Sequence, residues 1–181
     1  YLAQQSRQGV RDGYSFVEGT AGGVERSIGV GEDRHVALET RLRLINAKRL
    51  VVDWRGAAAG GLRPGAPPGN ANGFQLTIET GENAIESPMS VTFCTTEGCT
   101  ARYEGLAPYD WLTYRVEEDR QTKRFQAFVN GTLIQGGSSA SIERDHSLFR
   151  LAASQAADDN SELLRVDYVR IQTMNIDNPG C

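Results

Sequence analysis

The chain has 181 residues, of which 39% are hydrophobic and 20 are glycine, and its formal net charge is -4 at pH 7. This length suits one well-buried core and is short for two, so we expect residues 1–181 to form a single domain. The 19 basic and 23 acidic residues are spread along the chain, which argues against nucleic acid or an anionic membrane surface as the partner. No apolar run approaches the roughly 20 residues that span a bilayer, so we expect no membrane insertion.

The first half of the chain predicts strands after a short polar segment. Residues 1–12 are polar and weakly patterned, which indicates an N-terminal arm or a short helix. Within residues 34–46 apolar and charged side chains alternate, as in Leu38 and Glu39, and this period of two predicts a strand with one buried face. Further runs with the composition of strands occupy residues 14–19, 24–30, 49–56, 74–80, 90–95, 100–105, 147–154 and 163–173.

Residues 110–135 predict three strands joined by two turns. Aromatic and β-branched residues alternate with polar ones over residues 111–116, and a charged turn follows at residues 117–123. Asn130 and Gly131 stand between two apolar runs, which is typical of a type I′ hairpin, because both central residues of that turn need a positive φ. With roughly a dozen strands, almost no helix and regular turn signals, the chain favours an all-β sandwich.

Residues 57–72, AAAGGLRPGAPPGNAN, interrupt this pattern. Their Gly and Pro content excludes regular structure, and the segment is long for a connection inside a compact domain. Loops of this length are often functional, so the segment is either a binding loop or a surface excursion without a ligand.

Cys94 and Cys99 bracket TTEG, a turn-like insert between two short strand-like runs. A disulfide here would staple a hairpin and would indicate an oxidising compartment, so we expect a secreted, periplasmic or cell-surface protein. The alternative is half of a metal site, but no second pair of Cys or His completes it. Cys181, the last residue, has no evident partner in the sequence.

Five short motifs occur in a particular order: ETRLRL at residues 39–44, GFQL at 73–76, a Trp-x-x-Tyr strand from Trp111, the Val-Asn-Gly hairpin at 129–131, and VDYVRI at 166–171. This order resembles the concanavalin A-like lectin/glucanase superfamily. The nearest groups are laminarinase and licheninase-type β-glucanases, 3-keto-disaccharide hydrolase-like domains and laminin G-like modules. The resemblance implies a jelly-roll sandwich of two antiparallel sheets, with Trp111 in its core.

The β-glucanases of this superfamily carry an E-x-D-x-x-E strand, whose outer carboxylates lie about 5 Å apart and act as nucleophile and acid/base. The matching strand of this chain has Gln75, Thr77 and Thr80 at the three motif positions. Neither an amide nor a hydroxyl replaces a catalytic carboxylate, so this chemistry is missing. Glu39 and Glu79 remain as catalytic candidates, and they would have to line the same concave face.

Other catalytic arrangements have less support. His35 and His146 lie in polar contexts, and no Ser or Cys in a nucleophile elbow accompanies them. A polysaccharide lyase would need an Arg, a His or Asn and a Tyr on one sheet face, but the Tyr-x-Lys-x-Gly-x-Tyr strand of such enzymes is absent. The residues that could converge in such a set are Arg41, Arg43, Gln75 and Tyr103.

Carbohydrate sites pair flat aromatic faces with amides and charged groups that hydrogen-bond to hydroxyls. Trp54 precedes the 57–72 segment and Phe74 follows it, so both are candidate stacking platforms, although Trp54 suits the core equally well. The candidate ligand-binding set is Trp54, Phe74, Gln75, Asp53, Arg55 and Tyr103.

A structural calcium ion is a possible cofactor, since calcium prefers several oxygen ligands on turns. Asp158, Asp159 and Asn160 cluster on one turn, and Asp167 matches a position where the resembling folds often carry a calcium ligand. The alternative is a solvated turn, because Asp and Asn are common turn residues.

The sequence thus favours a non-catalytic carbohydrate-binding or adhesive extracellular module, with a polysaccharide or glycan as its partner. One alternative is a structural subunit of a surface assembly or appendage, which would self-associate or bind other surface proteins. The other is a glycoside hydrolase or polysaccharide lyase. An apolar outer patch would favour assembly, and a close carboxylate pair would favour hydrolysis.

Overall fold

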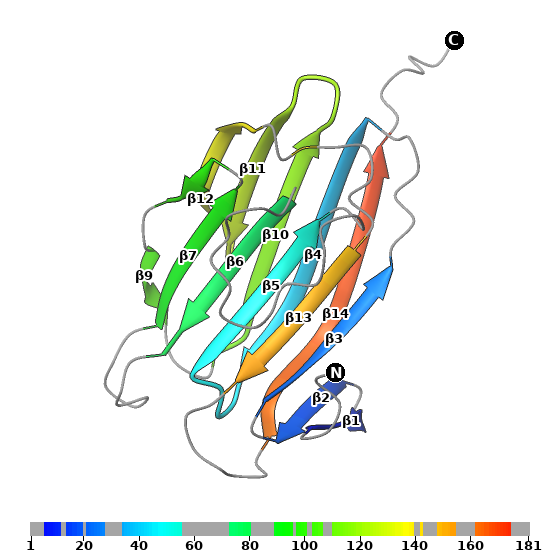
Figure 1. The fold of residues 1–181 in the computed structure, drawn as a ribbon, viewed down its shortest axis with the longest axis vertical. Helices are drawn as coiled ribbons and strands as arrows, with labels where there is room; N and C mark the ends of the chain where they lie inside the picture. The colour runs from blue at the N-terminus through cyan, green and yellow to red at the C-terminus, as the bar shows by residue number, and fades with distance from the viewer. Residues whose placement is uncertain are drawn as a thin grey trace.

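The computed structural model describes residues 6–11, 14–19, 21–27, 34–55, 73–80, 89–95, 97–100, 103–106, 110–139, 142, 148–154 and 162–174. These residues contain strands and no helix, so none of them lies in a helix that could cross a membrane. The strands are β1 (Ser6–Arg11), β2 (Tyr14–Gly19), β3 (Ala21–Ser27), β4 (His35–Leu44), β5 (Arg49–Arg55), β6 (Gly73–Glu79), β7 (Met89–Thr95), β8 (Gly98–Cys99), β9 (Tyr103–Leu106), β10 (Leu112–Asp119), β11 (Arg124–Val129), β12 (Thr132–Ser138), β13 (Leu148–Ser154) and β14 (Glu162–Met174) (Figure 1).

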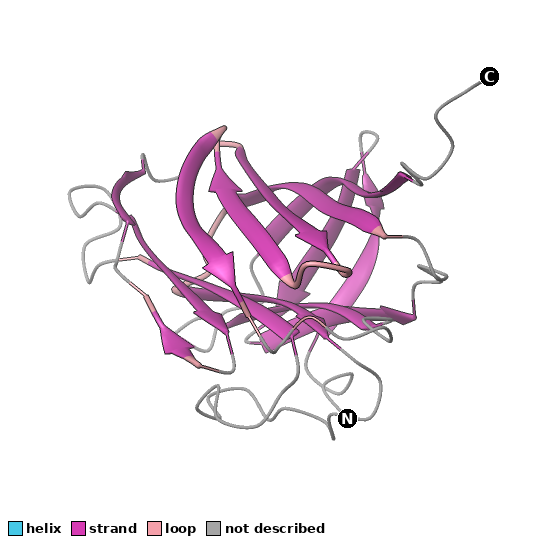
Figure 2. Ribbon diagram, turned by 90° about the horizontal axis from the view of Figure 1, so that it is seen from above, coloured by secondary structure: helices cyan, strands magenta, loops and turns pink. Residues whose placement is uncertain are grey.

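The strands form two antiparallel sheets that pack face to face. Sheet A has the order β1-β2-β14-β4-β10-β11-β12. Sheet B has the order β3-β13-β5-β6-β7-β8, and β9 also pairs with β7. Sheet B lies in front of sheet A in Figure 1, and Figure 2 shows the two layers from above. The prediction of a jelly-roll sandwich of two antiparallel sheets is confirmed.

The core lies between the sheets and follows from the period-two pattern of the strands. In β4, Leu38 and Leu42 are fully buried, whereas Glu39 between them is partly exposed on the outer face. Phe74 of sheet B packs against Phe125 of sheet A with ring centroids 5.1 Å apart, so aromatic contacts join the two layers. Burying a side chain of this size stabilises the fold by about 1.5–3 kcal/mol.

Two short-range predictions are confirmed. Asn130 and Gly131 have φ values of 49° and 77°, which are the positive angles that a type I′ turn requires. Cys94 and Cys99 are directly opposite each other in β7 and β8 and form a disulfide.

The N-terminal residues differ from expectation. Residues 6–11 form β1, an edge strand that pairs with β2 from Ser6 opposite Gly19 to Arg11 opposite Tyr14. Pairing at a sheet edge uses backbone groups, so it does not need the apolar alternation that this segment lacks. The 57–72 segment lies outside the described residues.

Candidate functional site

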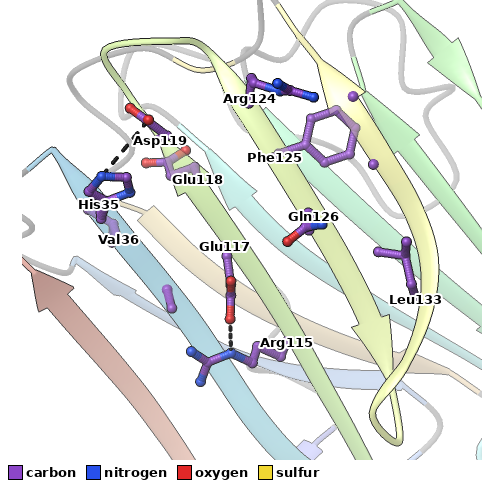
Figure 3. Close-up of a pocket in the computed structure, with 13 residues that line it drawn as sticks. His35, Val36, Arg115, Glu117, Glu118, Asp119, Arg124, Phe125, Gln126 and Leu133 are labelled. Carbon is purple, nitrogen blue, oxygen red and sulfur yellow. Dashed lines mark hydrogen bonds and ion pairs between the residues drawn. The ribbon is translucent and has the colours of Figure 1, made fainter.

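The outer face of sheet A contains a hollow of about 550 Å³ between β4, β10, β11 and β12 (Figure 3). Its side chains come from strands that are far apart in the sequence but adjacent in the sheet. The hollow is defined by His35, Arg115, Glu117, Asp119, Arg124, Gln126 and Leu133, together with Gly136 and Gly137.

Strand alternation puts these polar groups on one face. In β10 the side chains of Tyr114, Val116 and Glu118 are buried, whereas those of the intervening residues Arg115 and Glu117 are partly exposed. Gln126 of β11 is directly opposite Glu117, so its exposed amide joins the same face. On the other side of the hollow Leu133 points from β12 toward these strands and is 51% exposed (Figure 3).

Arg115 is held in a fixed position by three acceptors. Its Nε donates to Glu117 Oε1 at 2.6 Å, and its Nη1 donates to Glu39 Oε2 at 3.1 Å and to Gln172 Oε1 at 2.9 Å. Partial burial alone would lower the pKa of Arg115, but the hydrogen bonds to Glu117 and Glu39 raise it. The guanidinium is therefore a permanent cation with a set orientation.

Glu39 anchors this network from β4. The hydroxyl of Tyr168 donates to Glu39 Oε1 at 2.7 Å, and Arg170 Nη1 lies 3.9 Å from the same oxygen. The Tyr168 hydrogen bond, followed by Arg115, lowers the pKa of Glu39 against the opposing effect of burial. Glu39 in turn raises the pKa of Tyr168, so the pair consists of a carboxylate and a neutral phenol.

Beside the hollow, arginine side chains cover two partly exposed aromatic rings of this face, Trp111 and Tyr168. The guanidinium of Arg41 lies 5.1 Å from the centre of the Trp111 ring, and that of Arg170 lies 4.9 Å from the Tyr168 ring. Trp111 is only partly buried, because its side chain lies on the outer face of sheet A. The resemblance predicted that it would lie in the core.

Asp119 closes one end of the hollow. Its carboxylate accepts from the side chain of Arg34 at 3.4 Å and lies 3.9 Å from His35 Nε2 (Figure 3). It also accepts from the backbone N–H groups of Gln121 and Thr122. Partial burial would raise the pKa of Asp119, but the Thr122 N–H, Arg34 and the further hydrogen bonds lower it to about 2.

The two aromatic residues predicted to stack on a sugar, Trp54 and Phe74, are buried in the core. Trp54 and Phe74 are 1% and 2% exposed, and both rings pack in the core with centroids 6.1 Å apart, so neither has a face free for a sugar. Trp54 and Phe74 lie two residues from the buried Val52 and Leu76, so their side chains point to the same inner face of sheet B. A side chain on the inner face cannot contact a ligand at the surface.

The other predicted ligand contacts lie on sheet B. Asp53 and Gln75 are opposite each other on β5 and β6, and Gln75 Nε2 donates to Asp53 Oδ1 at 2.8 Å. Asp53 is buried, which leaves it little contact with solvent. Arg55 and Tyr103 belong to β5 and β9 of the same sheet, and their side chains are outside the described part of the chain.

Glu39 and Glu79 do not form a catalytic pair. Glu39 lies on the outer face of sheet A, whereas Glu79 belongs to β6 of sheet B, where it faces Arg49 at 3.6 Å. The core therefore separates the two carboxylates. The proposed lyase set is divided in the same way, with Arg41 and Arg43 in sheet A and its remaining members in sheet B.

The calcium candidates are divided between described and undescribed parts of the chain. Asp158, Asp159 and Asn160 lie outside the described residues, as does His146. Asp167 is exposed, and its carboxylate accepts a hydrogen bond from Arg41 Nη1 at 3.0 Å. The carboxylate is therefore already paired with the guanidinium of Arg41. Within the described ranges no three His, Cys, Asp or Glu residues are grouped to hold a metal ion.

The sequence interpretation missed Arg115, Glu117 and Gln126. Their signal was available, because Arg115 and Glu117 alternate with buried residues in the predicted strand at 111–116 and the following turn. Gln126 follows across the turn, where an antiparallel partner is expected. What the sequence lacked was the order of the strands, which places β4, β10, β11 and β12 side by side around the hollow.

No family model matches the chain, and no curated protein matches it in sequence. Solved structures do match it. The carbohydrate recognition domain of Emp47p has a TM-score of 0.64 and 10% identity, covering 93% of this chain and 86% of that one. The potassium-bound form of the Emp46p carbohydrate recognition domain has a TM-score of 0.59 and 10% identity, covering 92% and 86%.

A legume lectin-like domain from Entamoeba histolytica has a TM-score of 0.58 and 13% identity, covering 94% of this chain and 88% of that one. The Emp46p domain is also known in a metal-free form, which has a TM-score of 0.59. At identities this low the similarity shows the fold alone. This chain has the concanavalin-like jelly-roll fold that these lectin domains share.

Proposed function

We propose that this chain is a non-catalytic carbohydrate-binding module that holds a glycan in the hollow on the outer face of sheet A. The observation that carries the proposal is the composition of that hollow. A fixed guanidinium, a carboxylate and an exposed amide, from Arg115, Glu117 and Gln126, lie opposite the apolar side chain of Leu133. Planar polar groups bind neighbouring hydroxyls, and an apolar side chain packs against the C–H face of a sugar ring.

The size of the hollow supports the same conclusion. Its volume of about 550 Å³ is within the usual range for sites that hold small ligands. The solved structures with this fold include domains described as carbohydrate recognition domains, which makes sugar binding the first function to test.

The charge state of this face favours binding over hydrolysis. A glycosidase needs one carboxylic acid whose pKa is raised so that it holds a proton. Glu39 and Asp119 have lowered pKa values instead, and Glu117 is bound to Arg115. Glu39 and Asp119 are therefore suited to accept hydrogen bonds and not to donate a proton.

The described surface gives less support to the assembly alternative. Among the described residues only two large hydrophobic side chains are exposed, Leu133 of β12 and Val169 of β14. The two strands are separated by β4, β10 and β11 in sheet A, so these side chains do not form a continuous apolar patch. The Cys94–Cys99 disulfide supports a secreted, periplasmic or cell-surface location.

The proposal is tested by affinity electrophoresis through gels that contain one polysaccharide each, for the wild-type chain and two Gln→Ala variants. Gln126→Ala removes an exposed amide from the hollow, whereas Gln121→Ala removes one from the β10–β11 turn. Loss of one hydrogen bond should weaken retardation about fivefold for Gln126→Ala only. The proposal fails if no glycan retards the wild type, or if both variants are retarded as strongly as the wild type.

The same gels with calcium and with chelator test the predicted ion site. The predicted calcium ligands are the 158–160 turn and Asp167, and Asp167 is paired with Arg41. Retardation that is lost in chelator would therefore support calcium ligands in the 158–160 turn. Retardation that is equal in both gels would remove calcium from the proposal. Loss of all retardation in chelator would also contradict the glycan site of sheet A, because none of the residues that define the hollow belongs to that turn.

A further inference from the structure

We propose that the hollow selects an acidic saccharide, one that carries carboxylate or sulfate groups, and that Arg124 is the residue that determines this selectivity. The inference rests on the proposed function and adds the charge of the ligand. It follows from how the ionic groups of the hollow are paired with one another.

The carboxylates of the hollow are already neutralised by neighbouring cations. Glu117 is bound by Arg115 at 2.6 Å, and Asp119 is bound by Arg34 at 3.4 Å. Beneath the sheet surface, Glu118 is bound by Arg120 at 2.7 Å. A ligand that enters the hollow therefore meets few carboxylate groups that are still available to repel a negative charge.

Arg124 differs from these arginines. Its side chain is exposed and lines the hollow at the end opposite Arg115, yet it forms no ion pair within 4.0 Å with any described residue. Asp119 is directly opposite it across the β10–β11 pair, but the carboxylate of Asp119 is turned to Arg34 and to two backbone N–H groups. Arg124 is thus a cation of the hollow whose charge the described residues leave uncompensated.

Arg115 supplies a second donor group for an anion. Its contacts with Glu117, Glu39 and Gln172 use Nε and Nη1, and its Nη2 donates to none of the described residues. The two N–H groups of Nη2 are held in place by the other three contacts, which is the preorganised state that favours binding of a carboxylate or sulfate.

The distance between the two arginines suits a ligand that carries repeated charges. Arg115 lies four residues before Asp119 on β10, and Asp119 is opposite Arg124, so the two positions are about 14 Å apart along the strands. The Glu117–Gln126 pair lies between them and offers an acceptor and an amide for the hydroxyls of the intervening sugar. An acidic oligosaccharide would thus meet Arg124 at one end of the hollow and, at the other, the Arg115–Glu117 ion pair with its two remaining Nη2 N–H donors.

The overall charge of the chain makes the test specific. At a formal net charge of -4 the protein repels polyanions in general, so it does not bind them as an ion exchanger would. Binding of an acidic glycan would then report a local site and not the average surface.

The experiment measures, by titration calorimetry at physiological ionic strength, the affinity for matched acidic and neutral probes. The pairs are oligogalacturonates with their methyl esters, and sulfated with unsulfated galactan oligosaccharides. The wild type should bind at least one acidic probe about tenfold more tightly than its neutral counterpart, and the two pairs distinguish carboxylate from sulfate. Arg124→Gln should weaken acidic binding about three- to tenfold, as expected for an exposed ion pair, and should weaken acidic binding more than neutral binding.

Lys123→Gln is the matched control, because Lys123 is an exposed cation next to Arg124 that does not line the hollow. It should bind like the wild type, and Arg124→Lys should keep at least part of the acidic preference. Equal wild-type affinity for both members of each pair, with binding still sensitive to Gln126→Ala, would overturn this inference and leave the proposed function standing. Loss of affinity in Lys123→Gln equal to that in Arg124→Gln would also overturn it. Absence of binding to every probe would overturn both.

Discussion

The buried ion pair beneath the hollow allows a sharp test of the structure. Glu118 points inward from β10, its side chain has 0% exposure, and it accepts from Arg120 Nε at 2.7 Å. The Arg120 side chain is 7% exposed. Arg120→Met should lower the free energy of unfolding by about 3–5 kcal/mol, because it leaves a carboxylate buried without its guanidinium.

Urea unfolding measures this loss. With a slope of about 2 kcal/mol per molar, a loss of about 4 kcal/mol lowers the midpoint by about 2 M. The double variant Glu118→Met with Arg120→Met should be more stable than Arg120→Met alone, because it also removes the buried charge. Arg49→Met, which breaks the exposed pair with Glu79, is the control and should cost less than about 1 kcal/mol. If Arg120→Met costs no more than Arg49→Met, or the two Met substitutions simply add, the pair is not buried as described.

Phe74→Ala should lower the free energy of unfolding by about 3–5 kcal/mol, since its ring packs against core rings of both sheets; a loss below about 1 kcal/mol on chemical denaturation would contradict that packing. Replacing Cys94 and Cys99 by Ala should cost about 2 kcal/mol, because their disulfide closes a loop with a sequence separation of 5. A reductant should destabilise the wild type by the same amount and leave the double Ala variant unchanged. The pKa of Asp119 is about 2 in the folded protein against an ordinary value of 3.8, so its stabilisation is complete above about pH 4 and is lost as the pH falls toward 2. Asp119→Asn should flatten the dependence of stability on pH in that window, and an unchanged slope would contradict the lowered pKa.

Local patterns predicted much of the fold because they act over a few residues. The alternation in residues 34–46 assigned Leu38 to the core and Glu39 to the outer face, as the structure has them. The Asn130-Gly131 turn depends only on the backbone preferences of those two residues. β1 escaped prediction because an edge strand is held by backbone hydrogen bonds that its side chains do not reveal.

The site depends on contacts that no local pattern contains. Arg115 is fixed by Glu39 and Gln172, which are 76 and 57 positions away and become neighbours only through the order β14-β4-β10. Period-two parity correctly separates an inner from an outer side chain, but it does not say to which sheet the strand belongs. For that reason Glu39 and Glu79 looked equivalent in the sequence, and the structure puts them on opposite layers.

One irregularity of the β11–β12 pair has a consequence for how this surface can change. Ala127 is opposite Gln135 and Phe128 is opposite Leu133, so the register shifts by one residue and Ile134 is the extra residue of β12. Such a bulge increases the local twist of a strand. Ile134 packs against the core, whereas Leu133 faces the hollow. Deleting one residue at this point would therefore change which side chains of β12 line the hollow. Because β12 is the last strand of its sheet, the remaining pairs would keep their alignment. Insertions or deletions in the edge strand β12 can therefore change which ligand the hollow prefers. The packing of the core between the two sheets does not have to change with them.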